Sequence, residues 1–371
     1  MKSIRILLVA ALVVAATSVR GPVAAPAAAS ARAPLATTTL AATAPTYAQL
    51  IGQKLVVRMT GTAPTADLLG RIKRGEIGGV ILFGSNVTTK TALIALTGKL
   101  RAAAAAGGQP HFLIAVDQEG GSVQRIPWAP PTMSAPQMGA NGSTTTARSQ
   151  GASTGSALRG LGINVDFAPV ADVPASTTSF MYQQGRTWSF SATKTAALSD
   201  AFASGLESGH VVPSMKHFPG IGYATLNTDS YNVHINVSAS ALAPGLLPYR
   251  TAISHNIPLI MLSNATYGAY DGHHAAGWAP AIQTLLRTTL GFKGVTITDS
   301  LTGIAGALGV SQNTLAFVSA KAGTDMLLLT GSEASTKTVF SSLLASATAG
   351  SISRATLLAS YNRILAMKAR L

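Results

Sequence analysis

The sequence predicts one closed barrel of eight parallel strands, each followed by a helix, behind an export signal and a short tether. Three observations favour it: apolar runs alternate with helix-like segments, there are eight such pairs, and polar residues follow most of the runs. Strands alternating with helices form parallel βαβ units, and such a barrel takes about 250 residues. The 371 residues are enough for it. An open doubly wound sheet is the second choice, disfavoured because no G-x-G-x-x-G follows the first run.

The first 46 residues are expected to direct export. Lys2 and Arg5 precede an apolar stretch from 6 to 16, and small residues follow it. This is the order of a secretory signal, and the stretch is shorter than the roughly 20 residues that span a bilayer. An uncleaved membrane anchor is the alternative. We place the signal region at 1–31, an Ala/Pro/Thr-rich tether at 32–46 and the barrel at 47–371, and expect a secreted or envelope-associated protein.

The remaining chain supplies the repeating unit. Helical spacing of apolar residues is clearest at 90–106, 192–208, 279–290 and 310–322. The glycines within 151–160 precede a strand, so they do not predict a phosphate loop. The predicted strands are 55–59, 79–83, 112–116, 163–169, 211–217, 258–263, 294–298 and 326–330.

The composition excludes several classes of protein. Hydrophobic residues make up 47% and charged residues 11%, which disfavours an extended disordered chain. The absence of cysteine excludes disulfides, thiolate metal sites and a catalytic thiol. Lys and Arg number 27 against 13 Asp and Glu, a formal charge of +14. The basic residues are scattered, so we expect association with the anionic cell envelope and no nucleic-acid partner.

Polar clusters stand where the predicted strands end. The carboxyl ends of barrel strands meet at one rim, where catalytic groups gather. With only 13 carboxylates in the chain, carboxylates at three of these exits are unexpected by chance, and the rim is predicted to bind a small molecule. The exits are Ser85-Asn86, Asp117-Gln118-Glu119, Asp172, Lys216-His217, Asn264 and Asp299.

The sequence around these exits resembles glycoside hydrolase family 3, in its single-domain bacterial β-N-acetylhexosaminidase type. Five segments match the family's blocks in order. They are Asp117-Gln118-Glu119-Gly120-Gly121-Ser122-Val123-Gln124-Arg125, 167–173, 185–190, Lys216-His217-Phe218-Pro219-Gly220 and 291–301. The resemblance implies a carbohydrate substrate and no cofactor. No metal site is evident, and we expect a monomer.

The resemblance also implies roles. Asp299 matches the nucleophile, which a retaining glycosidase needs to attack the anomeric carbon; its structural alternative is the N-cap of the helix that follows. Asp117, Arg125, Arg186, Lys216 and His217 match the sugar-binding residues. We expect Asp117, Arg125 and Arg186 to contribute to sugar affinity and not to stability. Glu119 is assigned to the glycine turn, and Asp172 to bonding loop amides.

The sequence departs from the family at the proton donor. The hexosaminidases carry Asp-Ser-His on the loop after their Lys-His block, and that His is the acid/base. This chain reads Asp229-Ser230-Tyr231. A phenol with a pKa of about 10 is a poor acid near neutral pH. The alternatives are His234, three residues further on, and Asp229 itself, if burial raises its pKa.

Two functions therefore remain open. The first is an exported retaining glycosidase that removes terminal β-linked N-acetylglucosamine from peptidoglycan-type or related glycans through a covalent glycosyl-aspartate. The second is a catalytically weakened relative that binds amino-sugar glycans without efficient turnover. The loop from Asp229 to His234 separates them.

Overall fold

The computed structural model describes residue 21 and residues 44–109 and 111–371. The predicted export signal, apart from residue 21, and nearly all of the predicted tether fall outside these residues. Among those described, no single helix is long and apolar enough to cross a membrane; one pair of helices, Leu301–Ala307 and Gln312–Ala322, passes together but is bent by 117°.

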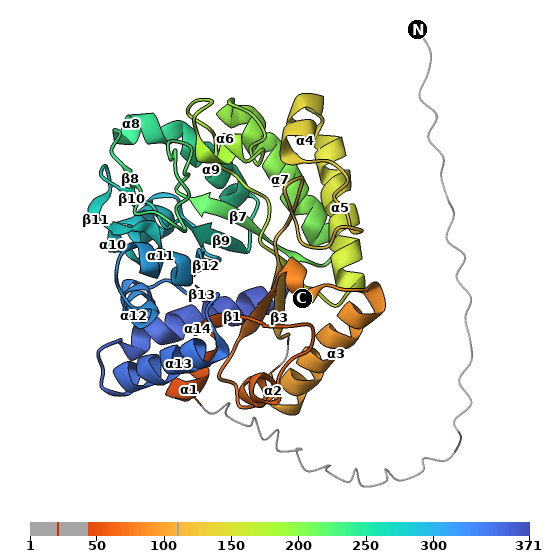
Figure 1. The fold of residues 1–371 in the computed structure, drawn as a ribbon, viewed down its shortest axis with the longest axis vertical. Coiled ribbons are helices and arrows are strands. Elements are labelled where there is room, and N and C mark those ends of the chain that lie inside the picture. The colour runs from red at the N-terminus through yellow and green to blue at the C-terminus, as the bar shows by residue number, and fades with distance from the viewer. Residues whose placement is uncertain (1–20, 22–43, 110) are drawn as a thin grey trace. The chain divides into compact units, whose positions relative to one another are not determined.

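Eight parallel strands form the central sheet in the order β12-β9-β7-β6-β3-β2-β1-β13 (Figure 1). Each lies within, or one residue beyond, a predicted strand, so the prediction of eight strands is confirmed. Their bounds are β1 Leu55–Arg58, β2 Gly79–Leu82, β3 Leu113–Val116, β6 Val165–Asp166, β7 Val212–Phe218, β9 Leu259–Leu262, β12 Val295–Thr298 and β13 Leu327–Leu329.

The two ends of this sheet join, which closes the barrel. Ile297 of β12 and Met326, just before β13, form a parallel bridge. The Met326 amide donates to the Thr296 carbonyl (2.8 Å), and the Thr298 amide donates to the Met326 carbonyl (3.1 Å). The closed barrel is therefore correct and the open doubly wound alternative is wrong.

Helices surround the barrel and cover its outer face (Figure 1). The helices predicted at 90–106 and 192–208 have those bounds, and the one at 279–290 is divided into an α-helical and a π-helical part. The larger helices are α1 Tyr47–Gly52, α2 Ala66–Lys73, α3 Lys90–Ala106, α4 Ala135–Asn141, α5 Thr144–Gly160, α7 Ala192–Ser208, α9 Leu247–Ser254, α10 Pro280–Thr284, α11 Leu301–Ala307, α12 Gln312–Ala322, α13 Glu333–Thr348 and α14 Arg354–Lys368. Short elements lie in the segments that follow β3, β6, β7 and β9. They are β4 Gln118–Gly120, β5 Val123–Gln124, α6 Phe180–Gln183, β8 His234–Ile235, α8 Ala239–Leu242, β10 Thr266–Tyr267 and β11 Asp271–Ala275.

The glycines of α5 allow it to pack closely on α7. A Cβ added at Gly151 would lie 2.1 Å from the Phe202 carbonyl oxygen, and one at Gly205 would lie 2.2 Å from the Arg148 carbonyl oxygen. Backbone contact of this kind leaves no room for a side chain. Gly151 and Gly155 are thus helix-packing residues and not part of a phosphate loop.

Strand alternation directs the site residues inward. Side chains two residues apart point to the same face of a strand. Ala115 and Ile297 pack in the barrel interior. Asp117 and Asp299 follow them by two residues, so both side chains enter the carboxyl end of the barrel.

A buried lysine at the other end of the barrel is expected to make stability depend on pH. The Lys368 ammonium donates to the Gln53 side-chain oxygen (2.6 Å) and the Gly78 carbonyl (3.1 Å), and burial lowers the pKa of Lys368 to about 7. An unfolded lysine has a pKa near 10.4, so between these values the unfolded chain binds more protons and the free energy of unfolding rises with pH. Between pH 7 and pH 9 the titration of Lys368 raises the free energy of unfolding by about 2 kcal/mol.

Chemical denaturation at several pH values measures the slope of the free energy of unfolding against pH. Lys368→Met should reduce it, whatever its effect at any one pH. Some slope should remain, because burial also lowers the pKa of Lys54, to about 8. Equal slopes in the two proteins would contradict the assignment.

Candidate active site

A cavity of about 150 Å³ opens at the carboxyl ends of the barrel strands. It brings together all five predicted sugar-binding residues and both predicted catalytic carboxylates. Tyr231 is not among its lining residues. These are Ile81, Phe83, Asp117, Glu119, Val123, Arg125, Arg186, Lys216, His217, Asp229, Met261, Asp299, Ser300, Leu328 and Thr330.

One side of the cavity is an ion-pair network centred on Glu119. The Lys216 Nζ lies 2.6 Å from a Glu119 oxygen and 2.7 Å from Asp117. The Arg186 guanidinium donates two hydrogen bonds to the Glu119 carboxylate, of 2.8 and 2.7 Å. Burial alone would raise the pKa of Glu119. The charges of Arg186 and Lys216 outweigh this effect of burial and lower the pKa to about 2. The assignment of Glu119 to the turn alone was wrong: it lines the cavity and holds both cations in place.

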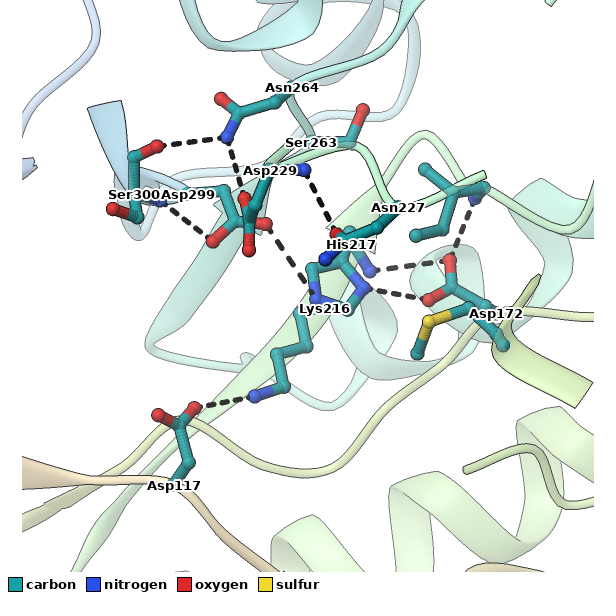
Figure 2. A network of polar contacts seen from close by, with 12 residues as sticks. Asp117, Asp172, Lys216, His217, Asn227, Asp229, Ser263, Asn264, Asp299 and Ser300 are labelled. Atoms are coloured by element: carbon teal, nitrogen blue, oxygen red, sulfur yellow. Dashed lines mark hydrogen bonds and ion pairs between the residues drawn. The ribbon is translucent and has the colours of Figure 1, made fainter. Parts of the chain in front are cut away.

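His217 is oriented by a buried carboxylate. Its Nδ1 lies 2.8 Å from an oxygen of Asp172, and its Nε2 lies 3.8 Å from an oxygen of Asp299 (Figure 2). Asp172 also accepts a hydrogen bond from the Ile221 amide (2.8 Å), which confirms its expected role of bonding loop amides. A carboxylate on one ring nitrogen fixes the imidazole so that the other faces the cavity.

Asp299 and Asp229 lie next to each other on the opposite side (Figure 2). One Asp299 oxygen accepts from the Ser300 amide (2.7 Å). Ser300, and not Asp299, occupies the N-cap position of α11, so the structural alternative for Asp299 is wrong. Burial, and then the charge of Asp299, raise the pKa of Asp229 to about 7.

The loop backbone separates Asp229 from Tyr231. The Asn227 side chain accepts from the Asp229 amide (3.0 Å), and its carbonyl accepts from the Tyr231 amide (3.0 Å). This turn directs Asp229 into the cavity, while the Tyr231 side chain is 52% exposed. His234 is also exposed, on β8. Neither of them lines the cavity that holds Asp299.

The sequence placed Asn264 among the polar residues at the strand exits but gave it no individual role. It follows β9, and its side-chain amide donates both to Asp229 (2.9 Å) and to the Ser300 carbonyl (3.0 Å) (Figure 2). It thus ties the segment of Asp229 to the segment of Asp299 and Ser300. Its place after a strand was the available signal, but the contact depends on a loop path that the sequence does not specify.

Arg186 is expected to support both the fold and sugar binding, contrary to the expectation from sequence. Arg186→Ala would leave the buried Glu119 with Lys216 alone. Removing one partner of a buried ion pair costs about 3–5 kcal/mol. Arg125→Ala is the matched control, because Arg125 makes no ion pair or side-chain hydrogen bond with any residue that the structure describes.

Thermal melting and N-acetylglucosamine titration measure these effects. Arg186→Ala should lower both the melting temperature and the affinity. Arg125→Ala should lower the affinity alone. An unchanged melting temperature in Arg186→Ala would restore the original expectation.

Comparison with known proteins agrees with the fold and with the family resemblance. The family model described as glycosyl hydrolase family 3 N terminal domain matches residues 47–367. An uncharacterized secreted glycosyl hydrolase of Arthroderma benhamiae is 34% identical, over 86% of this chain and 92% of that protein. The β-hexosaminidase LpqI of Mycobacterium tuberculosis is 31% identical, over 75% and 71%.

Solved structures give the same result. A family 3 β-N-acetylglucosaminidase from Paenibacillus superposes with a TM-score of 0.83 at 28% identity, over 88% of this chain and 63% of that one. A β-N-acetylhexosaminidase from Beutenbergia cavernae superposes with a TM-score of 0.81 at 29% identity, over 88% and 99%.

A barrel whose rim holds paired carboxylates beside buried cations is consistent with a glycosidase, the class to which the relatives belong. The chain belongs to glycosyl hydrolase family 3, of the β-N-acetylhexosaminidase type.

Proposed function

We propose that this protein is an exported, retaining enzyme that removes terminal β-linked N-acetylglucosamine from cell-wall glycans, with Asp299 as nucleophile and Asp229 as acid/base. The observation that supports it is the pair of adjacent carboxylates in one cavity, of which Asp229 has its pKa raised to about 7. Two carboxyl groups whose environments separate their proton affinities are what a nucleophile and a general acid require.

The reaction has two balanced steps. In the first, an Asp299 oxygen bonds to the anomeric carbon, the bond to the leaving oxygen breaks, and that oxygen takes the Asp229 proton. In the second, the Asp229 carboxylate takes a proton from water, whose oxygen bonds to the anomeric carbon and releases the Asp299 carboxylate. The anomeric configuration is retained.

The network opposite the carboxylates is suited to hold the sugar. Asp117 accepts from hydroxyl groups, whereas Lys216, Arg186 and Arg125 donate to them. Lys216 and Arg186 are fixed by Glu119 before substrate arrives, so little side-chain entropy is lost on binding. His217, fixed by Asp172, adds a group at the side of Asp299.

Export and an envelope substrate rest on different evidence. The secretory pattern at 1–31 and the name of the secreted Arthroderma relative support export. The net charge of +14 supports work near anionic envelope polymers.

Chromogenic glycosides test the proposal. The purified protein should cleave an aryl β-N-acetylglucosaminide faster than the matching β-glucoside and release N-acetylglucosamine from a muropeptide disaccharide. Proton NMR should show the β-anomer of the product first. Initial appearance of the α-anomer would refute retention, and an inert protein that still binds N-acetylglucosamine would favour the weakened relative.

A further inference from the structure

Two half-buried arginines beside the cavity have no anionic partner. Among the residues that the structure describes, seven arginines are buried or half-buried. Four of them pair with carboxylates and a fifth donates to a backbone carbonyl: Arg71, Arg186, Arg287 and Arg363, and then Arg354. Arg58 and Arg125 have no such partner among the described residues, and the Nε of each is buried without a hydrogen bond. A half-buried cation without a counter-ion is unfavourable, which points to an anion supplied by a ligand.

Both guanidinium groups lie against one aromatic ring. The Cζ atom of Arg58 is 5.2 Å from the centre of the Phe83 ring, and the Cζ atom of Arg125 is 5.6 Å from it. Phe83 and Arg125 also line the cavity. The ring attracts the two cations but accepts none of the conventional hydrogen bonds that five N–H groups on each guanidinium can donate. Phe83 therefore holds the pair in place and leaves its donors for a ligand.

Strand geometry directs Arg58 toward the cavity. Arg58 is the last residue of β1, and Val56, two residues before it, packs in the barrel interior. Side chains two residues apart share one face of a strand, so Arg58 enters the carboxyl end of the barrel. Its partner in the register with β2 is Ile81, which lines the cavity.

The order of the strands places Arg58 across the barrel from the proposed acid/base. In the closed order of the sheet, three strands separate β1 from β7 in either direction. The loop that follows β7 carries Asp229, and a leaving group departs toward the residue that protonates it. An anion beside Arg58 therefore belongs to the sugar that occupies the cavity and not to the sugar that leaves.

We propose that Arg58 and Arg125 recognise an acidic substituent, a carboxylate or a phosphate, on the terminal amino sugar, which rests on the proposed function. A guanidinium group binds either anion through paired N–H donors. The carboxylates of the neighbouring network do not oppose this, because Lys216 and Arg186 already neutralise them. The preferred substrate is then an acidic derivative of a β-linked N-acetylglucosaminide.

Sugar binding without catalysis tests the pair. Calorimetry compares N-acetylglucosamine with its 6-phosphate and with N-acetylmuramic acid, which carries a carboxylate on its 3-oxygen substituent. At least one acidic sugar should bind the wild type about tenfold more tightly than the neutral sugar, the gain expected from one charge-assisted hydrogen bond. The sugar that gains identifies the anion as phosphate or carboxylate. Salt of about 0.5 M should reduce the gain. Equal or weaker binding of both acidic sugars overturns the proposal.

Variants assign the preference to Arg58. Arg58→Met should remove it, whereas Arg58→Lys, which keeps the positive charge, should retain part of it. Lys99→Met removes an exposed cation from α3 and should keep the wild-type preference. A preference that survives Arg58→Met unchanged would also overturn the proposal.

The matching aryl glycosides separate this inference from the proposed function. Their kcat/KM values should follow the same preference for an acidic sugar. If the preference holds in binding while none of these glycosides is cleaved, the arginine pair stands and the proposed function fails.

Discussion

Replacing Asp299 with Asn is expected to reduce hydrolysis of every β-N-acetylglucosaminide by at least about 10³-fold, because a side-chain amide is a far weaker nucleophile than a carboxylate toward the anomeric carbon. A large loss should be seen with every leaving group, since the same carboxylate displaces all of them. Steady-state kinetics on an aryl glycoside and on chitobiose measure it. A 5-fluoro glycosyl fluoride should also label the wild type on the peptide that contains Asp299.

The same variant is expected to fold. Asp299 contributes one short hydrogen bond to Ser300 and raises the pKa of Asp229 by its charge. Removing that charge should lower the pKa of Asp229 and leave the melting temperature equal or higher. Asp67→Asn, a half-exposed carboxylate on α2, is the control for the loss of one acidic group. Labelling of another residue, or full activity of Asp299→Asn, would refute the nucleophile.

The sequence was sufficient for the barrel because its strands are short and almost wholly apolar. Runs such as 79–82 can only be buried, and buried strands alternating with helices leave few arrangements. It was also sufficient for Asp117, Lys216 and Asp299, because a residue at the exit of a barrel strand points to the rim whatever the loops do.

Pairings across the rim could not be predicted. Glu119 and Arg186 are 67 residues apart, and their contact depends on the paths of two loops. The same holds for Asn264 and Asp229, 35 residues apart. A local motif does not encode distances across a closed sheet. From the motif, Glu119 was assigned only to the glycine turn, whereas in the structure its carboxylate contacts both Arg186 and Lys216.

The loop after β7 shows the same limit on a smaller scale. The family motif Asp-Ser-His places Tyr231 at the acid position, so that the sequence alone predicts a site without its proton donor. The turn at Asn227 instead directs Asp229 inward and leaves Tyr231 in solvent. Two residues that are neighbours in sequence can have unrelated environments when a turn lies between them.

The largest leaving-group effect is expected from Asp229. General acid catalysis is worth about 10²–10⁴-fold and matters most when the departing oxygen is strongly basic. Asp229→Asn should therefore lose about that factor on chitobiose, while formation of the glycosyl-enzyme from a dinitrophenyl glycoside should change little. Azide should restore turnover of the activated glycoside by attacking the anomeric carbon, since it needs no base to remove a proton. Tyr231→Phe is the matched control: it removes the exposed hydroxyl of the same loop and should leave both rates unchanged.

The pH profile supplies the second measurement. An acid catalyst works in its protonated form, so wild-type kcat/KM on chitobiose should fall as the pH rises through about 7, the value to which burial and the charge of Asp299 raise the pKa of Asp229. Asp229→Asn should lose this alkaline limb. If the limb persists, the proton comes from His217, the other titratable group beside Asp299. If instead the wild type cleaves only the dinitrophenyl glycoside and Tyr231→His gains activity on chitobiose, the protein is the weakened relative, and Asp229 holds a proton that it does not transfer.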